Sequence, residues 1–136
     1  MSIILLRHAS AGDRHAWVGD DALRPLDERG RAQALELRDR LVSRGVERVV
    51  SSPFARCVET VAPLAAALGV AVETDDRLAE GADPTVAREL LTDLSSGWVA
   101  CTHGDVIVAV TGEMLKKGAA FVLDDELRPV EKLKRS

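Results

Sequence analysis

The sequence contains few aromatic residues and few cysteines. Its 136 residues include two Phe, two Trp, two Cys and no Tyr. A hydrophobic core must therefore be built from aliphatic side chains, chiefly Ala, Val and Leu. The two cysteines, Cys57 and Cys101, lie far apart in the chain, unlike the cysteines of a disulfide framework or a thiolate metal site. We therefore expect a reducing, cytoplasmic setting.

The sequence also lacks an excess of positive charge and a long apolar run. Lys and Arg total 18 against 22 Asp and Glu, and the net charge of −4 argues against nucleic acid as the main partner. The longest nearly uncharged stretch, residues 58–72, is shorter than the roughly 20 apolar residues of a membrane span. The apolar run at residues 1–6 has neither a basic leader nor a cleavage site. We therefore expect no signal peptide and no membrane partner.

The periodicity of the sequence predicts strands that alternate with helices. Strands are expected at residues 3–6, 48–50, 70–72 and 98–101, followed by a hairpin of residues 119–123 and 127–133. Helices are expected at residues 28–44, 53–68, 84–96 and 106–115. This order predicts a single α/β domain spanning residues 1–136. Its fold is expected to be a three-layer sandwich with a mostly parallel central sheet, helices on both faces and a C-terminal edge hairpin.

Helix boundaries are expected at residues with the matching capping chemistry. Asp27 and Ser52 are the expected N-caps of the first two helices, and Pro53 suits the first helical position. Gly45 and Gly69 are expected to end these helices.

Polar side chains follow three of the expected strands: Arg7 and His8 after the first, Ser51, Ser52 and Arg56 after the second, and Thr102 and His103 after the fourth. The carboxyl ends of parallel strands meet at one edge of a sheet, where α/β proteins bind their ligands. We therefore expect two histidines and two arginines to converge on one pocket.

Two arginines beside two histidines suit phosphoryl transfer. Each guanidinium offers a planar fork of donors that matches phosphate oxygens and stays charged at any working pH. A neutral imidazole can attack phosphorus when a hydrogen bond anchors its second ring nitrogen, and a cationic imidazole can bind the equatorial oxygens. This set supplies in-line positioning and charge compensation without a metal.

Three segments resemble the signature segments of the histidine phosphatase superfamily, which includes the phosphoglycerate mutases. They are LLRHA at residues 5–9, SSPFARCVET at residues 51–60 and THG at residues 102–104. Their order and spacing match over nearly the whole chain, and the second segment is the most specific. The resemblance implies the phosphoglycerate mutase-like fold and a phosphatase that uses no metal or other cofactor.

The resemblance also implies roles for individual residues. His8 would be the nucleophile that becomes phosphorylated, and the phosphoryl oxygens would be held by Arg7, Arg56 and His103. Gly104 opens an expected helix, whose amino end is suited to anions. The family usually has Gly at the position of Ala9, so a methyl group there is expected to restrict the loop or narrow the entrance.

The chain resembles a minimal branch of the superfamily. Mutases and many small-molecule phosphatases are longer and carry an insertion over the active site, whereas this chain has only the short stretch 73–82. In this respect it resembles the short bacterial phosphohistidine phosphatases. The segment RPLDERG at residues 24–30 also resembles a segment that those proteins carry before their first helix. It also resembles, through Trp17, residues 19–21 and Arg24, the phosphatase module that follows a Nudix domain in some bacterial nucleotide-processing proteins, although it contains no Nudix box.

The leaving group distinguishes the possible substrates. A phosphate ester needs a general acid to protonate its departing alkoxide, whereas a phosphohistidine needs less help. Glu80 lies near the position of the acid in ester-cleaving members of the family, and a solvated loop carboxylate fits the sequence equally well. Arg14, Arg24 and Trp17 are expected to line the entrance and contact substrate, but Arg24 is equally compatible with a structural role.

Simpler interpretations exist for single residues. Arg7 and His8 alone would suit a solvent-facing strand end, Arg56 would suit a helix-surface pair with Glu59, and His103 would suit a core histidine bonded to backbone. The three segments in order favour the functional interpretation. Other polar and sulfur-containing residues have structural interpretations: a surface position for His15, buried packing for Cys57 and Cys101, and a solvated tail for Lys132, Lys134 and Arg135.

The leading hypothesis is a phosphatase that acts on phosphohistidine in a protein through phosphorylated His8. A phosphomonoesterase for a phosphorylated small molecule, either a metabolite or a nucleotide, is the alternative. A further alternative is a phosphate-binding module without activity.

Overall fold

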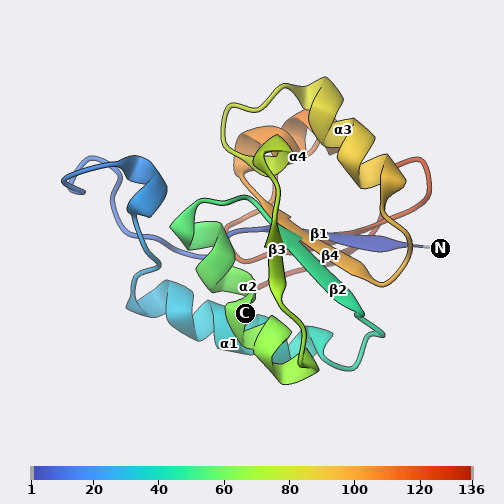
Figure 1. The fold of residues 1–136 in the computed structure, drawn as a ribbon, viewed down its shortest axis with the longest axis horizontal. Helices are drawn as coiled ribbons and strands as arrows, with labels where there is room; N and C mark the ends of the chain where they lie inside the picture. Colours follow the sequence, from blue (N-terminus) through green and yellow to red (C-terminus); the bar gives the residue numbers. More distant parts are fainter. Residues whose placement is uncertain (1, 136) are drawn as a thin grey trace.

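A six-stranded sheet with the strand order β3-β2-β4-β1-β5-β6 forms the middle layer of the fold (Figure 1). The computed structural model describes residues 2–135. The strands are β1 (Ile3–Arg7), β2 (Arg48–Ser51), β3 (Val72–Thr74), β4 (Trp98–Thr102), β5 (Ala120–Leu123) and β6 (Pro129–Leu133). Neighbours from β3 to β1 pair in parallel, whereas β5 pairs antiparallel with both β1 and β6. The predicted fold class, with its mostly parallel sheet and edge hairpin, is confirmed.

Helices cover both faces of the sheet (Figure 1). They are α1 (Glu28–Leu41) and α2 (Ala55–Leu68) on one face, and α3 (Pro84–Asp93) and α4 (Gly104–Thr111) on the other. Two 3₁₀ turns, η1 (Asp21–Leu23) and η2 (Asp76–Leu78), lie in the connections that follow β1 and β3. Within residues 2–135, no helix has the length and apolar character needed to cross a membrane.

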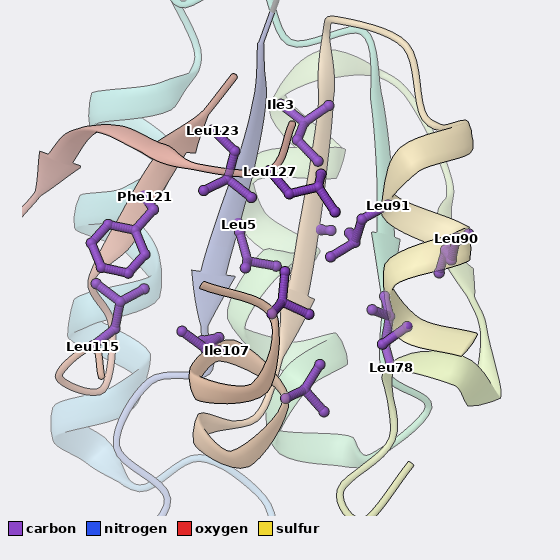
Figure 2. Packing of buried hydrophobic residues seen from close by; sticks show 14 of the residues in the cluster. Ile3, Leu5, Leu78, Leu90, Leu91, Ile107, Leu115, Phe121, Leu123 and Leu127 are labelled. Atoms are coloured by element: carbon purple, nitrogen blue, oxygen red, sulfur yellow. The ribbon is translucent and has the colours of Figure 1, made fainter. Parts of the chain in front are cut away.

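Alternate side chains of the central strands enter two separate hydrophobic clusters. Figure 2 shows the first cluster, in which Leu5 of β1 packs with Ile107 of α4 and Leu91 of α3. The next residue, Leu6, belongs to the second cluster, which includes Leu41 of α1. Because β1 is covered on both faces, all four of its apolar residues are buried, which explains the continuous apolar run in the sequence.

Helix α2 begins two residues later than expected. Asp27 is the N-cap of α1, as predicted, but Ser52 does not cap α2. The backbone of Phe54 is extended, and its N–H donates to the Ser52 hydroxyl at 3.2 Å. Pro53 therefore lies in the turn before the helix, and Phe54 occupies the N-cap position.

Three other helices end earlier than the sequence pattern predicts, and strand β3 starts later. The helix expected at 106–115 is α4, which ends at Thr111 because Gly112 adopts a left-handed φ of 78°. Helix α3 ends at Asp93 because Leu94 is extended. Helix α1 ends at Leu41, before the turn that contains Gly45. Strand β3 starts at Val72 because the preceding residues complete the end of α2, where the Val70 N–H donates to the Ala65 carbonyl at 3.0 Å.

Close contact between α1 and the loop after β1 depends on Gly30. A Cβ atom at position 30 would lie 1.8 Å from the carbonyl oxygen of Ser10. Asp27 strengthens this contact, since its Oδ1 accepts from the Gly30 N–H at 2.7 Å and its Oδ2 accepts from the Ser10 hydroxyl at 2.7 Å. The loop that carries the residues after His8 is thereby fixed to the start of α1.

Gly30→Ala is expected to destabilise the fold strongly, because the opposing oxygen belongs to the backbone and cannot rotate away. The free energy of unfolding in urea should fall by more than about 2 kcal/mol. Gly45→Ala is the control. Its Cβ would meet nothing within 4 Å but would lie at a φ of 75°, so about 1 kcal/mol is expected. Equal losses in the two variants would contradict the role assigned to the Ser10 contact.

Candidate active site

The carboxyl ends of β1, β2 and β4 lie side by side at one edge of the sheet. Arg7 at the end of β1 is in register with Thr102 at the end of β4. One residue further on, the His8 N–H donates to the Thr102 carbonyl at 3.1 Å, and the Ser52 N–H donates to the Cys101 carbonyl at 2.9 Å. The strand ladder therefore continues into the polar segments and fixes their backbones relative to one another.

The two histidines that follow β1 and β4 lie close together. Their ring centroids are 5.4 Å apart, with the planes inclined at 65°. Nδ1 of His8 is 2.8 Å from the Ala9 carbonyl oxygen. Because a carbonyl can only accept, Nδ1 must carry the proton, and Nε2 of His8 is left with its lone pair.

His8 is held in its neutral form. Burial lowers the pKa of His8 to about 3, against the opposing effect of its hydrogen bond to Ala9, and the positive charges of His103, Arg56 and Arg7 lower this pKa further. At neutral pH an imidazole with this pKa keeps the lone pair on Nε2, so His8 can act as a nucleophile.

His103 is buried and contacts side chains from β2 and α2. Its Nε2 is 2.9 Å from the Ser52 hydroxyl oxygen and 3.5 Å from Sγ of Cys57. The Phe54 ring packs edge-on against it at 4.8 Å between centroids. Cys57 and Cys101 are both free and buried, as expected, but the contact of Cys57 with His103 was not evident from the sequence.

Arg56 is fully buried, so the interpretation as a helix-surface pair with Glu59 is wrong. Its Nη2 is 3.1 Å from Oδ2 of Asp21 and 3.5 Å from Oε2 of Glu80. Glu59 instead accepts from the Leu26 N–H at 3.1 Å. Arg56 therefore faces two carboxylates that belong to loops outside its own helix.

Arg7 packs against the first residue of α4. Its Nη1 donates to the Leu115 carbonyl at 2.7 Å. A Cβ at position 104 would lie 3.1 Å from Cζ of Arg7, so glycine at this position makes room for the guanidinium. Burial, and then the charge of Arg135, lower the pKa of Arg7.

Three buried nitrogen atoms of these residues, Arg7 Nε, Arg56 Nε and His103 Nδ1, make no hydrogen bond to any residue that the structure describes, and Arg56 Nη2 has only its ion pairs with Asp21 and Glu80. Leaving buried donors unpaired costs free energy. A tetrahedral oxyanion next to His8 would offer acceptors to such donors. The arrangement is therefore suited chemically to binding a phosphoryl group beside a neutral imidazole.

A cleft of about 560 Å³ opens at this edge of the sheet. Among the predicted site residues, six line it: Arg7, His8, Arg14, Arg24, Glu80 and Gly104. Arg56 and His103 are buried and are not among its lining residues. Trp17 lies instead at a neighbouring hollow that shares Arg24 with the cleft.

Glu80 and Arg24 make different kinds of contact. Glu80 accepts a hydrogen bond from Arg14 at 2.6 Å, and this contact raises the pKa of Arg14. Arg24 is buried and donates to the Ala11 carbonyl at 2.5 Å and to Oδ1 of Asp21 at 3.0 Å. Arg24 therefore holds the loop between β1 and α1 together in addition to lining the cleft.

Ala9 does not narrow the entrance, contrary to expectation. It is fully buried in a small cluster with Ala11, Leu26 and Ala34, and it is not among the lining residues of the cleft. Its N–H donates to the Thr60 hydroxyl at 2.9 Å. A methyl group at this position therefore contributes to packing under the loop.

Several residues of the site were not identified from the sequence. Asp21 joins the predicted Glu80 as a carboxylate partner of Arg56, and the Thr60 hydroxyl donates to the Arg56 carbonyl at 2.6 Å. Lys117 lines the cleft, and burial followed by the charge of Arg7 lowers its pKa. Thr60 is four residues from Arg56 on α2, whereas Asp21 and Lys117 lie far in sequence from the arginines they act on, so only the acidic character of residues 19–21 could have drawn attention to Asp21.

Sequence comparison identifies the family of this arrangement. Residues 3–82 match the profile of the histidine phosphatase superfamily (branch 1). An 8-oxo-(d)GTP phosphatase from Mycolicibacterium smegmatis is 37% identical over 112 residues, which cover 78% of this chain and 35% of that protein. The chain thus spans about a third of the length of this curated relative.

Solved structures share the whole fold. The protein histidine phosphatase SixA complexed with tungstate has a TM-score of 0.79 at 21% identity, and the match covers 98% of this chain and 97% of SixA. A mycobacterial glucosyl-3-phosphoglycerate phosphatase has a TM-score of 0.76 at 16% identity, over 93% and 95% of the two chains. At these identities the likeness concerns the fold.

His8→Asn is expected to weaken the dependence of stability on pH. The folded pKa of about 3 lies below the unfolded value of about 6.5, so the stability associated with neutral His8 is complete above pH ~6.5 and is lost as the pH falls toward 3. Between pH 7.5 and 5, urea unfolding of the wild type should lose about 2 kcal/mol more than that of the variant. His15→Asn, which removes an exposed imidazole, should behave as the wild type. Parallel curves for wild type and His8→Asn would contradict the burial of a neutral His8.

Proposed function

The chain belongs to the histidine phosphatase superfamily (branch 1), and on this basis we propose that it hydrolyses phosphorylated substrates through a phosphorylated His8. The observation that carries the proposal is the set of buried nitrogen atoms of Arg7, Arg56 and His103 that make no hydrogen bond within the described chain, beside a neutral imidazole. A binding site for a neutral ligand would not need the fully buried guanidinium of Arg56 next to the half-buried one of Arg7.

The reaction proposed here has two displacement steps. Nε2 of His8 attacks phosphorus, a P–N bond forms, and the bond from phosphorus to the leaving group breaks. Water then attacks the phosphorus of phospho-His8, which releases inorganic phosphate and restores the imidazole. In both steps Arg7, Arg56 and His103 would donate to the phosphoryl oxygens, and the amino end of α4 at Gly104 would add a favourable dipole.

Binding of the phosphoryl group requires a change at Arg56. The carboxylates of Asp21 and Glu80 lie 3.1 and 3.5 Å from its Nη2, where a phosphoryl oxygen would have to bind. We therefore expect the phosphoryl group to displace at least one of them from Arg56. Glu80, which lies on the cleft wall, would then be near the leaving group.

A small phosphorylated molecule is the substrate class that the site favours. Glu80 lines the same cleft as His8, which supports a role for its carboxyl group in proton donation to an ester leaving group. The M. smegmatis relative, an 8-oxo-(d)GTP phosphatase, supports a nucleotide as the phosphorylated molecule.

Protein phosphohistidine is the second candidate substrate. Only residues 75–83 connect β3 to α3, so no large insertion covers the cleft from this side. Similarity to SixA, named as a protein histidine phosphatase, supports the same candidate. A phosphohistidine leaves as an imidazole and depends less on Glu80, so the two candidates differ in their need for an acid.

His8→Asn is expected to abolish formation of a covalent phosphoenzyme. Wild-type protein mixed with ³²P-labelled phosphoramidate and quenched in alkaline denaturant should carry label that is stable to base and lost in acid, as expected of phosphohistidine. His8→Asn should not carry the label, whereas His15→Asn, at an exposed histidine on the wall of the same cleft, should retain it. Phosphate binding without any label in the wild type would favour a phosphate-binding module without activity.

Glu80→Gln is expected to slow ester hydrolysis according to the leaving group. For alkyl phosphates kcat should fall by about 100-fold, because the departing alkoxide needs a proton. For phosphoramidate and for p-nitrophenyl phosphate, the loss should be within about threefold. Glu73→Gln is the matched control, since Glu73 also forms an exposed ion pair with an arginine, Arg48. Equal losses for all leaving groups would contradict an acid role for Glu80.

A further inference from the structure

The lysines of this protein are concentrated near its carboxyl end and around two clefts. The sequence contains four lysines, all between residues 116 and 134. Lys117 lines the active-site cleft. The other three line a second cleft of about 440 Å³, whose lining residues are Arg29, Lys116, Ala119, Lys132, Lys134 and Arg135. We call this second hollow the basic cleft, since five of its six lining residues are cationic and none is acidic.

Most cations of the basic cleft form no ion pair within the described part of the chain. Within residues 2–135, Arg29 and the three lysines of this cleft have no carboxylate partner within 4.0 Å. Glu131, which precedes Lys132 on β6, pairs with Arg44 at 3.0 Å instead. Elsewhere the chain pairs most of its arginines with carboxylates, as in the Arg48 and Glu73 pair at 2.8 Å.

This concentration of charge has an electrostatic consequence. Five like charges around one hollow repel each other and create a strong local potential, although the whole chain carries a net charge of −4. A polyanion bound in the hollow would relieve this repulsion. The earlier interpretation of Lys132, Lys134 and Arg135 as a solvated tail does not account for their gathering in a concave site with Arg29 and Lys116.

The basic cleft adjoins the active-site cleft. Lys116 lines the basic cleft, and the next residue, Lys117, lines the active-site cleft. Arg135 reaches across this boundary, because its Nη1 donates to the Lys117 carbonyl at 3.2 Å. Its charge also acts on Arg7, whose pKa is lowered by burial and then by Arg135.

We propose that Arg29, Lys116, Lys132, Lys134 and Arg135 form an accessory site that binds the phosphate chain of a di- or triphosphorylated small molecule. The volume of about 440 Å³ is within the range of small-ligand pockets, and several cations around a hollow suit a compact chain of negative charges. Such a chain has two possible sources: a substrate whose reacting phosphoryl group is at His8, or a separate molecule. The first source rests on the proposed function, whereas the site itself does not.

The binding test uses inorganic tripolyphosphate and isothermal titration calorimetry on His8→Asn, which prevents turnover. Adding Lys132→Gln and Lys134→Gln should weaken binding to the accessory site at least tenfold and reduce the stoichiometry by one. Adding Arg38→Gln and Arg128→Gln removes the same charge from surface positions outside both clefts, and binding should change less than twofold. Equal affinity and stoichiometry in the two charge variants would overturn the proposal.

Steady-state kinetics distinguish the two sources of the phosphate chain. These measurements use the same charge substitutions in protein that retains His8. If the chain belongs to the substrate, Lys132→Gln with Lys134→Gln should raise KM for GTP at least tenfold and leave KM for p-nitrophenyl phosphate unchanged. If the chain belongs to a separate molecule, both KM values should stay unchanged while tripolyphosphate binding is lost.

Two further outcomes separate this proposal from the proposed function. A similar rise in KM for GTP and for p-nitrophenyl phosphate would mean that the lysines act on the active-site cleft itself. Unchanged tripolyphosphate binding, with a loss of activity only on a phosphohistidine protein, would assign the lysines to protein docking. Either result overturns the accessory site. Absence of hydrolysis of every phosphorylated substrate would refute the proposed function, while tripolyphosphate binding would still decide on the accessory site.

Discussion

Parallel pairing of β1, β4 and β2 is the constraint on which the active site depends. It places the ends of three strands at one edge, and the first residue beyond β1 stays in the ladder through the His8 N–H and the Thr102 carbonyl. A slip of one residue in a strand would exchange its two faces. All four residues from Ile3 to Leu6 are buried, so a slip of one residue in β1 would bring Ser2 or Arg7 into a buried position, which the core resists. Hydrophobic burial thus fixes the positions of catalytic candidates that are themselves polar.

The fold and the central residues were predictable because they follow local rules. Strand and helix periodicity gave the order of elements, and motifs after three strands gave Arg7, His8, Arg56 and His103 as neighbours. The contacts that complete the site were not predictable, since they join loops whose paths depend on the folded chain. The carboxylate of Asp21, from the loop before α1, meets Arg56 of α2 at 3.1 Å, and no spacing in the sequence encodes that contact.

Charge is distributed unevenly around the site. Arg56 and Arg14 are met by carboxylates of Asp21 and Glu80, whereas Nε of Arg7 and Nδ1 of His103 have no hydrogen-bond partner in the described chain. The acidic side chains are partly exposed and can move, but the buried cations cannot leave. A phosphoryl group would therefore exchange with mobile carboxylates at the rim and meet fixed donors inside, which favours binding of anions over neutral molecules.

The position of β6 at the edge of the sheet has a consequence for association between molecules. An edge strand presents unpaired backbone groups to which a strand from another chain can add. Lysine side chains and proline on such a strand oppose this addition. Strand β6 carries Pro129 and Lys132, and Lys134 follows its last residue. At the other edge β3 has only three residues, which leaves little backbone to pair. The same positive charges that surround the basic cleft therefore also hinder aggregation through strand addition at this edge.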